Sequence, residues 1–278
     1  MGRKRVFITV KTYPTISAKY DELVCTAGIL EDGSWIRLYP LPFRKLKDDK
    51  QYHKYEWIEA DVEKNTSDFR PETYKVLNIE TIQVSPPPAK QMFRVWEERR
   101  RIIFNNKKIY TNLSELIGLS KKDNTSLAVF KPAKIHDLIW EETDREWPKE
   151  KIELLASKAK QLSLFESKEE VVENFQVVQK LPYKFSYTFC DDSGKKSTLM
   201  IEDWEIGMLY IRCLKNAEGN ENIALKKVHE TYFDKFLKKD LYFFLGTTLA
   251  YHSLSQNPFL IIGLFYPPKN PQLELFST

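Results

Sequence analysis

Three carboxylates stand close together in the sequence, at Glu202, Asp203 and Glu205. In a helix, Glu202 and Glu205 would lie three positions apart and share a face. Two carboxylates placed this way can bind Mg²⁺ or act as a general acid and base, which is the chemistry of a nuclease. Acidic residues also favour the first turn of a helix, because they meet the positive end of its dipole. The cluster therefore predicts either a catalytic pair, with Mg²⁺ as its cofactor, or only the start of a helix.

A second candidate site is Gly246-Thr247-Thr248, which follows the apolar segment Leu241 to Leu245. Backbone N–H groups and hydroxyls after a buried strand can bind a phosphate, and His252 follows Thr248 by about one helical turn. The segment lacks the glycine and lysine spacing of a P-loop. The alternative is that a threonine caps a helix and that His252 is a hydrogen-bonded, half-buried side chain. We count His252 with the three carboxylates as a candidate catalytic residue.

Other residue types argue against several enzyme classes. The four histidines are far apart in the sequence, with no His-Glu-x-x-His pair, and the three cysteines include no Cys-x-x-Cys. We therefore predict neither a dedicated metal site nor a disulfide framework. The Gly-x-Ser-x-Gly and Rossmann glycine patterns are missing too, which disfavours acyl transfer and dinucleotide chemistry.

Rings and cations alternate in the N-terminal part of the chain. In the expected strand Trp35-Ile36-Arg37-Leu38-Tyr39, the first, third and fifth side chains share a face. If Ile36 and Leu38 face the core, the other three form an open platform that could stack on bases and follow phosphates. The alternative is that the rings are buried and Arg37 binds a carboxylate. The candidate nucleic-acid contacts are Lys11, Tyr13, Trp35, Arg37, Tyr39, Arg44, Arg99, Arg100, Thr247 and Thr248.

Arg99 and Arg100 belong to a basic segment that runs from Lys90 to Lys108. Such a segment either contacts a polyanion or is the solvated face of a helix, and both interpretations remain open. The formal net charge of +4 is too small to decide between them.

One pentapeptide pattern occurs twice, as Gln161-Leu162-Ser163-Leu164-Phe165 and as Gln272-Leu273-Glu274-Leu275-Phe276. The second copy follows Pro267-Pro268 and has too little chain around it to build a core. The pattern resembles the Gln-Leu-x-Leu-Phe motif by which bacterial replication and repair proteins bind the DNA polymerase sliding clamp. In such complexes the Gln amide binds at the rim of a cleft, while the Leu and Phe side chains fill an apolar pocket. The alternatives are that the first copy ends an amphipathic helix and that the second packs on its own domain.

Three longer stretches, 11–44, 181–210 and 240–268, are similar to a bacterial family of hypothetical proteins. This resemblance extends over nearly the whole chain and implies no activity.

The apolar pattern predicts an α+β protein. Short alternating segments over 5–84 predict a small β-barrel or a bent antiparallel sheet, with a hairpin at Asp32-Gly33. A helix over 90–106 should follow Pro86-Pro87-Pro88, and strands over 127–132 and 134–140 should return to the first sheet. We expect a β-rich domain over 1–147, a helix and mobile linker over 148–180, an α+β domain over 181–268 and a tail over 269–278.

In the second domain, Ser193-Gly194 predicts another hairpin, and Asp203 or a neighbour should cap the first of two helices. The apolar runs Leu241 to Leu245 and Phe259 to Phe265 are typical of central strands that are buried on both faces.

The 278-residue chain has the apolar and aromatic content of a folded protein. No segment approaches the ~18 consecutive apolar residues that cross a bilayer, and Met1 to Arg5 leads directly into a strand pattern. We therefore expect a cytoplasmic protein with no membrane partner.

Together these features favour a DNA-transaction protein, in repair, replication or phage defence, that binds the sliding clamp and DNA. One alternative is a nuclease or base-excision glycosylase that the clamp motifs deliver to DNA. Another is an adaptor or sensor without catalysis. The positions of Glu202, Glu205, Thr247 and His252 should distinguish them, because convergence on one open cleft favours an enzyme and dispersal favours a binding protein.

Overall fold

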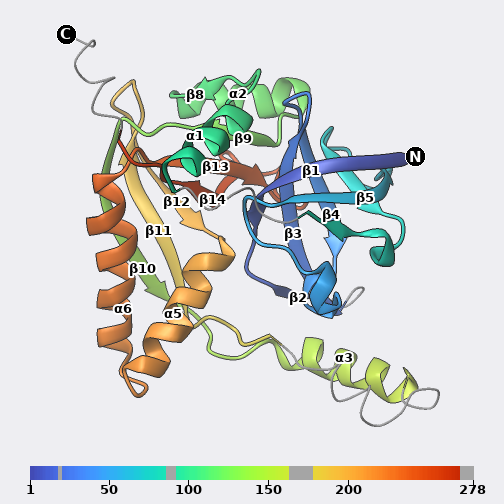
Figure 1. The fold of residues 1–278 in the computed structure, drawn as a ribbon. Helices are drawn as coiled ribbons and strands as arrows, with labels where there is room; N and C mark the ends of the chain where they lie inside the picture. Colours follow the sequence, from blue (N-terminus) through green and yellow to red (C-terminus); the bar gives the residue numbers. More distant parts are fainter. Residues whose placement is uncertain (18–20, 86–91, 163–177, 270–278) are drawn as a thin grey trace.

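The protein has the predicted α+β fold, seen here in a computed structural model that describes residues 1–17, 21–85, 92–162 and 178–269. A barrel-like N-terminal sheet is followed by helices and a C-terminal sheet (Figure 1). The two sheets pack against each other, and the site described below lies between them.

The N-terminal sheet has the strand order β1-β3-β4-β6-β5-β7, with β2 paired to β3. Because β1 also pairs with β5, the sheet closes into a barrel-like form. Gly33, at φ 85°, allows the predicted tight turn between β3 and β4. The strands are β1 (Gly2–Lys11), β2 (Thr15–Ser17), β3 (Asp21–Leu30), β4 (Trp35–Leu41), β5 (Trp57–Lys64), β6 (Thr73–Val76) and β7 (Gln83–Val84).

The interior of this sheet is filled by alternating β-branched and aliphatic side chains, among them Val6, Ile8, Ile36 and Leu38. Three short 3₁₀ helices connect its strands, namely η1 (Phe43–Lys45), η2 (Asp48–Lys50) and η3 (Ile79–Thr81).

The C-terminal sheet has the strand order β10-β11-β12-β14-β13-β9-β8. The predicted hairpin joins β11 to β12, and the two apolar runs form the adjacent buried strands β13 and β14. The strands are β8 (Ile109–Tyr110), β9 (Leu127–Phe130), β10 (Lys134–Glu142), β11 (Tyr183–Cys190), β12 (Lys196–Ile201), β13 (Tyr242–Thr247) and β14 (Phe259–Phe265).

The prediction that the strands over 127–132 and 134–140 return to the first sheet is wrong. β9 pairs with β13, and β10 pairs with β11, so both belong to the C-terminal sheet. Alternating and apolar segments show that a strand is half or fully buried, but they carry no information on which partner strand supplies its hydrogen bonds.

Side chains on the two faces of β13 pack in two different cores. The molecule therefore has three layers, namely the N-terminal sheet, the C-terminal sheet and the helices that cover it. Phe243 packs with Tyr187 and Ile206 in a core between the C-terminal sheet and its helices. Phe244, its neighbour, packs with Phe7 in a core between the two sheets.

The helices are α1 (Met92–Ile103), α2 (Leu113–Asp123), α3 (Lys149–Leu162), α5 (Trp204–Asn216) and α6 (Glu221–His229). The last is continued by η4 (Glu230–Lys235) and η5 (Phe236–Lys238).

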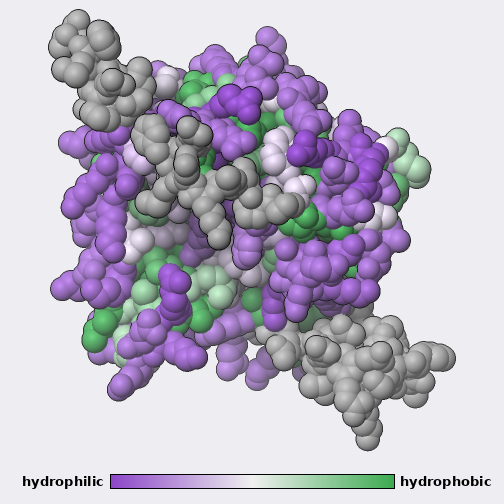
Figure 2. All heavy atoms as spheres, in the orientation of Figure 1, coloured by the Kyte–Doolittle hydropathy of each residue, from purple (hydrophilic) through white to green (hydrophobic). Residues whose placement is uncertain are grey.

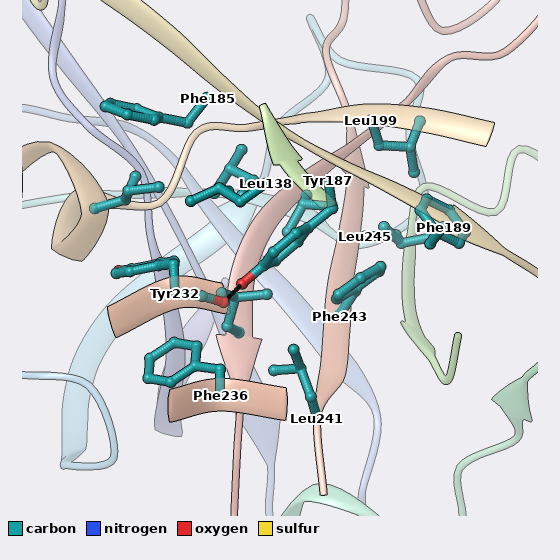
Figure 3. Close-up of a cluster of buried hydrophobic side chains, with 14 of the residues drawn as sticks. Leu138, Phe185, Tyr187, Phe189, Leu199, Tyr232, Phe236, Leu241, Phe243 and Leu245 are labelled. Carbon is teal, nitrogen blue, oxygen red and sulfur yellow. Dashed lines mark hydrogen bonds between the residues drawn. The ribbon is translucent and has the colours of Figure 1, made fainter. Parts of the chain in front are cut away.

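The core under α5 and α6 combines aliphatic side chains with many aromatic ones (Figure 3). The Tyr187 ring stacks on Phe243, with 5.4 Å between the ring centroids and 8° between the planes. The Tyr187 hydroxyl donates a hydrogen bond to the carbonyl of Tyr232, so the phenol is buried without losing its polar partner.

The outer surface seen in Figure 2 is mainly hydrophilic, with hydrophobic patches between the polar side chains. Met208 on α5 and Ile223 on α6 are among the exposed apolar residues. Within the described part of the chain, no helix combines the length and the apolar character that crossing a bilayer requires.

Helix α3 lies away from the C-terminal sheet, on the β2 side of the N-terminal sheet (Figure 1). Its buried residue Leu155 packs with Ile16 and Val178 in a small separate cluster. The Trp147 indole N–H, just before the helix, donates to the Val178 carbonyl at 2.8 Å. These contacts anchor the first half of the helix.

Candidate functional site

A cavity of about 200 Å³ lies where the C-terminal ends of β12 and β13 meet the N-terminal sheet. Its lining brings together residues that are more than 200 positions apart in the sequence. Six of the sequence candidates line it, namely Tyr13, Arg37, Tyr39, Glu202, Thr247 and Thr248.

Glu202 is placed by backbone hydrogen bonds to both sheets. Its N–H donates to the Ile261 carbonyl at 2.8 Å, and its own carbonyl accepts from the Tyr13 N–H at 2.9 Å. Burial raises the pKa of the Glu202 carboxyl group above its ordinary value. Such a carboxyl group holds its proton more readily than a solvated glutamate and can serve as a proton donor or acceptor.

Arg37 is the main cation of the cavity, and only 1% of its surface is exposed. One terminal nitrogen, Nη1, donates to Thr73 Oγ1 at 3.1 Å and to Ser126 Oγ at 2.8 Å. The other, Nη2, donates to the Ser126 carbonyl at 3.1 Å. The carboxylate of Glu72 accepts from the Ser126 hydroxyl at 2.7 Å, so it is linked to Arg37 only through Ser126. Neutral oxygens therefore hold the guanidinium group, and its charge remains available to the cavity.

A second buried arginine ties the cavity to β13. Arg70 donates to the carboxylate of Asp68 through Nε and Nη2, and to the Thr247 carbonyl through Nη1. The Thr247 hydroxyl in turn contacts His252 Nδ1 at 2.7 Å, and His252 Nε2 lies 3.2 Å from the Ser120 carbonyl. Burial lowers the pKa of His252, which favours its neutral form. His252 therefore fixes the position of the Thr247 hydroxyl group.

The three carboxylates predicted as one cluster are divided between two environments. Asp203 caps α5 by accepting from the Glu205 N–H at 3.2 Å, so the predicted capping role is confirmed. The expectation that Glu202 and Glu205 share a helix face is wrong, because the helix begins only at Trp204. Glu202 faces the cavity with Thr247, whereas Asp203 and Glu205 both bind Lys54.

Lys54 was not among the sequence candidates. Its Nζ lies 3.0 Å from Asp203 Oδ2 and 3.1 Å from Glu205 Oε2, and the lysine and Asp203 side chains are 3% and 0% exposed. Despite the burial, the attraction of these carboxylates raises the pKa of Lys54 well above its usual value. The residue precedes the strand β5 in a polar loop, and such a lysine has no sequence signal that distinguishes it from a solvated one.

The predicted open platform on β4 is not open. Ile36 and Leu38 face the barrel interior as expected, but the C-terminal sheet covers the opposite face. Trp35 packs edge-on against Phe244, with 6.0 Å between the ring centroids. Arg37 is buried as the alternative required, although it binds Ser126 and Thr73 rather than a carboxylate.

The other predicted cations have partners within the protein. Lys11 is buried, with Nζ 4.0 Å from the Phe43 ring centroid, and burial lowers its pKa to about 8. Arg44 pairs with Glu22 at 2.7 Å. Arg99 lies over the Tyr55 ring at 4.2 Å, and Arg100 pairs with Asp240 at 2.8 Å. In the described chain these residues thus stabilise the fold, and their role in binding nucleic acid stays a prediction.

The remaining predictions fall partly outside the described residues. Gln161 and Leu162 are the last residues of α3. Leu164, Phe165 and the second motif with Gln272, Leu273, Leu275 and Phe276 lie outside the described residues. Within the described ranges, no three His, Cys, Asp or Glu side chains are close enough to hold a metal ion.

Two sequence families cover most of the chain. One, described as a domain of unknown function (DUF8758), matches residues 2–105, which include the barrel-like sheet and α1. The other, described as a domain of unknown function (DUF8757), matches residues 112–278, which include nearly all of the C-terminal sheet. No curated protein matches the chain. Since the second match spans more than half of the sequence, the chain belongs to the family of the domain of unknown function DUF8757.

Proposed function

We propose that the protein is a cytoplasmic bacterial DNA-transaction protein, in repair, replication or phage defence, that the polymerase sliding clamp recruits. The observation that carries this proposal is the repeated Gln-Leu-x-Leu-Phe pentapeptide, at 161–165 and at 272–276. A chance match to this pattern is expected about once in several hundred chains of this length, from average residue frequencies.

The first pentapeptide begins with Gln161 and Leu162, the last two residues of α3, so its start is helical as the amphipathic-helix alternative expects. Extended peptides bind such clefts through a few side chains, and an ordering cost reduces the affinity of each copy. Two copies on one chain raise the apparent affinity when a partner has two equivalent clefts, as the clamp ring does.

The clamp proposal predicts a stepwise loss of binding. Replacing Leu275 and Phe276 by Ala should weaken binding to the sliding clamp by about tenfold or more, because these side chains would fill the apolar pocket. Adding Leu164→Ala and Phe165→Ala should abolish it. Binding can be measured by pull-down and by surface plasmon resonance on immobilised clamp.

The matched control changes the variable position of each motif, Ser163→Ala and Glu274→Ala. This variant should bind as the wild type does. Retained binding of the quadruple variant would remove the clamp from the proposal.

The cavity favours a second candidate, a DNA-processing enzyme that the clamp motifs deliver. Glu202 and Thr247 converge on one cavity, with His252 behind Thr247, whereas Glu205 is held by Lys54. In this candidate Glu202, whose pKa is raised by burial, acts as the general acid or base. The third candidate, an adaptor or sensor, uses the same cavity for binding alone.

The enzyme candidate makes Glu202 the critical carboxylate. Incubation with DNA, with and without Mg²⁺, should give strand cleavage or abasic sites, and Glu202→Gln should reduce the rate by about 10²–10⁴-fold. Glu205→Gln makes the same chemical change outside the cavity and should leave the rate nearly unchanged. Equal rates for wild type and Glu202→Gln would exclude this role, and absence of any reaction would favour the adaptor or sensor.

A further inference from the structure

The cavity between the sheets has the size of one aromatic ring system. Its volume is about 200 Å³. A cavity of about 150 Å³ holds benzene, and sites for drug-sized ligands begin near 300 Å³. A heterocycle of one or two rings therefore fits, while a whole nucleotide does not. The exposed residues Thr15 and Leu249 mark the opening to solvent.

Two buried polar atoms of the lining residues lack a hydrogen-bond partner, namely Arg37 Nε and Thr248 Oγ1. Glu202, a half-buried residue of the same lining, has no side-chain hydrogen-bond partner among the described residues. Buried polar groups in folded proteins almost always have partners, so unsatisfied groups around one cavity indicate a bound molecule. That molecule must offer an acceptor to Arg37 and a donor or acceptor to Glu202 and Thr248.

The charges of the cavity argue against a phosphate or carboxylate ligand. Arg37 would attract an anion, but Glu202 lines the same cavity and in its ionised form would repel it. Arg70 does not add a free cation, because its nitrogens bind Asp68 and the Thr247 carbonyl. A neutral planar ligand with acceptors and donors on adjacent atoms satisfies both charged groups.

The cavity also offers aromatic surface to a planar ligand. Tyr13 and Tyr39 line the cavity beside the polar groups. The Tyr13 hydroxyl donates to the Gln179 carbonyl at 2.8 Å, and its ring lies so close to Gly207 that a Cβ there would be 2.4 Å from Tyr13 Cδ2. The Tyr13 ring is thus fixed in place. Rings next to hydrogen-bonding side chains are how proteins hold a base that has left its stack.

We propose that this cavity accepts one unstacked nucleobase, with Arg37 donating to its polar edge and Glu202 and Thr248 completing the recognition. This proposal specifies how the protein would contact DNA in the proposed function. It rests on DNA binding and does not depend on the sliding clamp. The sugar and phosphate of the nucleotide would remain outside, near Thr15 and Leu249.

The test compares two DNA duplexes that differ at a single position. One carries a single bulged base and the other an abasic site in its place, and binding is followed by fluorescence anisotropy for each of the four bases. For at least one base, the bulged duplex should bind about tenfold or more tightly, the range expected for one stacked base. The corresponding free nucleoside should compete, and its potency shows whether the base comes from DNA or from the nucleoside pool.

Three variants connect this preference to the cavity. Glu202→Gln and Thr248→Val keep side-chain shape, and neither side chain has a hydrogen-bond partner among the described residues, so both variants should fold and both should lose most of the preference. Glu205→Gln should retain it. Equal binding of the bulged and abasic duplexes, an unchanged preference in both cavity variants, or its removal by inorganic phosphate would overturn the proposal. Since no clamp is present, failure here is distinguishable from failure of the clamp pull-down.

Discussion

Replacing Lys54 by Met should lower the free energy of unfolding by about 3–5 kcal/mol. The lysine Nζ lies 3.0 Å from Asp203 Oδ2, and both side chains are almost fully buried. Met fills a similar volume without the charge, so the variant leaves the Asp203 carboxylate buried and unpaired. Removing one partner of a buried pair costs far more than the pair contributes, since the remaining ion has lost its hydration as well. Equilibrium unfolding in urea measures the difference.

The effect should depend on pH. Burial already raises the pKa of Asp203, and Lys54 opposes this shift, so loss of the lysine should raise it further. Between the unfolded value of 3.8 and the raised folded value, the folded state binds a proton that the unfolded state does not. Stability of the variant should therefore fall as pH rises through the folded pKa and should recover at acidic pH.

The matched control is the double variant Lys54→Met with Asp203→Asn. Asn keeps the size of Asp203 and its ability to cap α5 but carries no charge. The double variant should therefore be more stable at neutral pH than Lys54→Met alone. A cost below about 1 kcal/mol for Lys54→Met would mean that water reaches Asp203 and that the pair is not buried in solution.

Replacing Phe243 by Ala should cost about 3–5 kcal/mol in unfolding free energy. The ring is fully buried between Tyr187 and Phe189, with centroid distances of 5.4 and 5.3 Å. The strand β13 cannot move to fill the space, because it is hydrogen-bonded to β14 and β9 on both sides. The lost contacts and the remaining cavity therefore add, and urea unfolding monitored by circular dichroism should show the full loss.

Two control variants should lose less stability than Phe243→Ala. Phe243→Leu leaves a smaller space and should cost clearly less than Phe243→Ala. Leu254→Ala removes an apolar side chain that is 83% exposed and should change stability by less than about 0.5 kcal/mol. Similar values for Phe243→Ala and Leu254→Ala would contradict the placement of Phe243 in the core.

Local sequence patterns were sufficient for the fold class and for several elements. Asp32-Gly33 predicted the first hairpin, and the apolar runs at 241–245 and 259–265 predicted the adjacent central strands. Asp203 was correctly expected as a helix cap. Each of these features depends on residues within one turn or one strand, so the information is present in a short segment.

The candidate site could be predicted only in part. Glu202 was selected as part of an acidic cluster, and Thr247 and Thr248 because they follow an apolar strand. All three line one cavity. Lys54 and Arg70 were missed, because the contacts that bury them, with Asp203 and with the Thr247 carbonyl, come from segments far away in the sequence. For the same reason the sequence left the exposure of Arg37 open, and the structure shows that it is buried.

The sequence by itself thus determined which segments form strands and helices and which side chains share a face. Only the tertiary structure decided what covers each face, because period-2 alternation places Trp35 and Arg37 together without stating whether solvent or a second sheet lies opposite. Packing of the C-terminal sheet on the barrel made the platform side of β4 one wall of a cavity between the sheets. It also separated Glu202 from Glu205, since hydrogen bonds to both sheets fix the first while Lys54 binds the second.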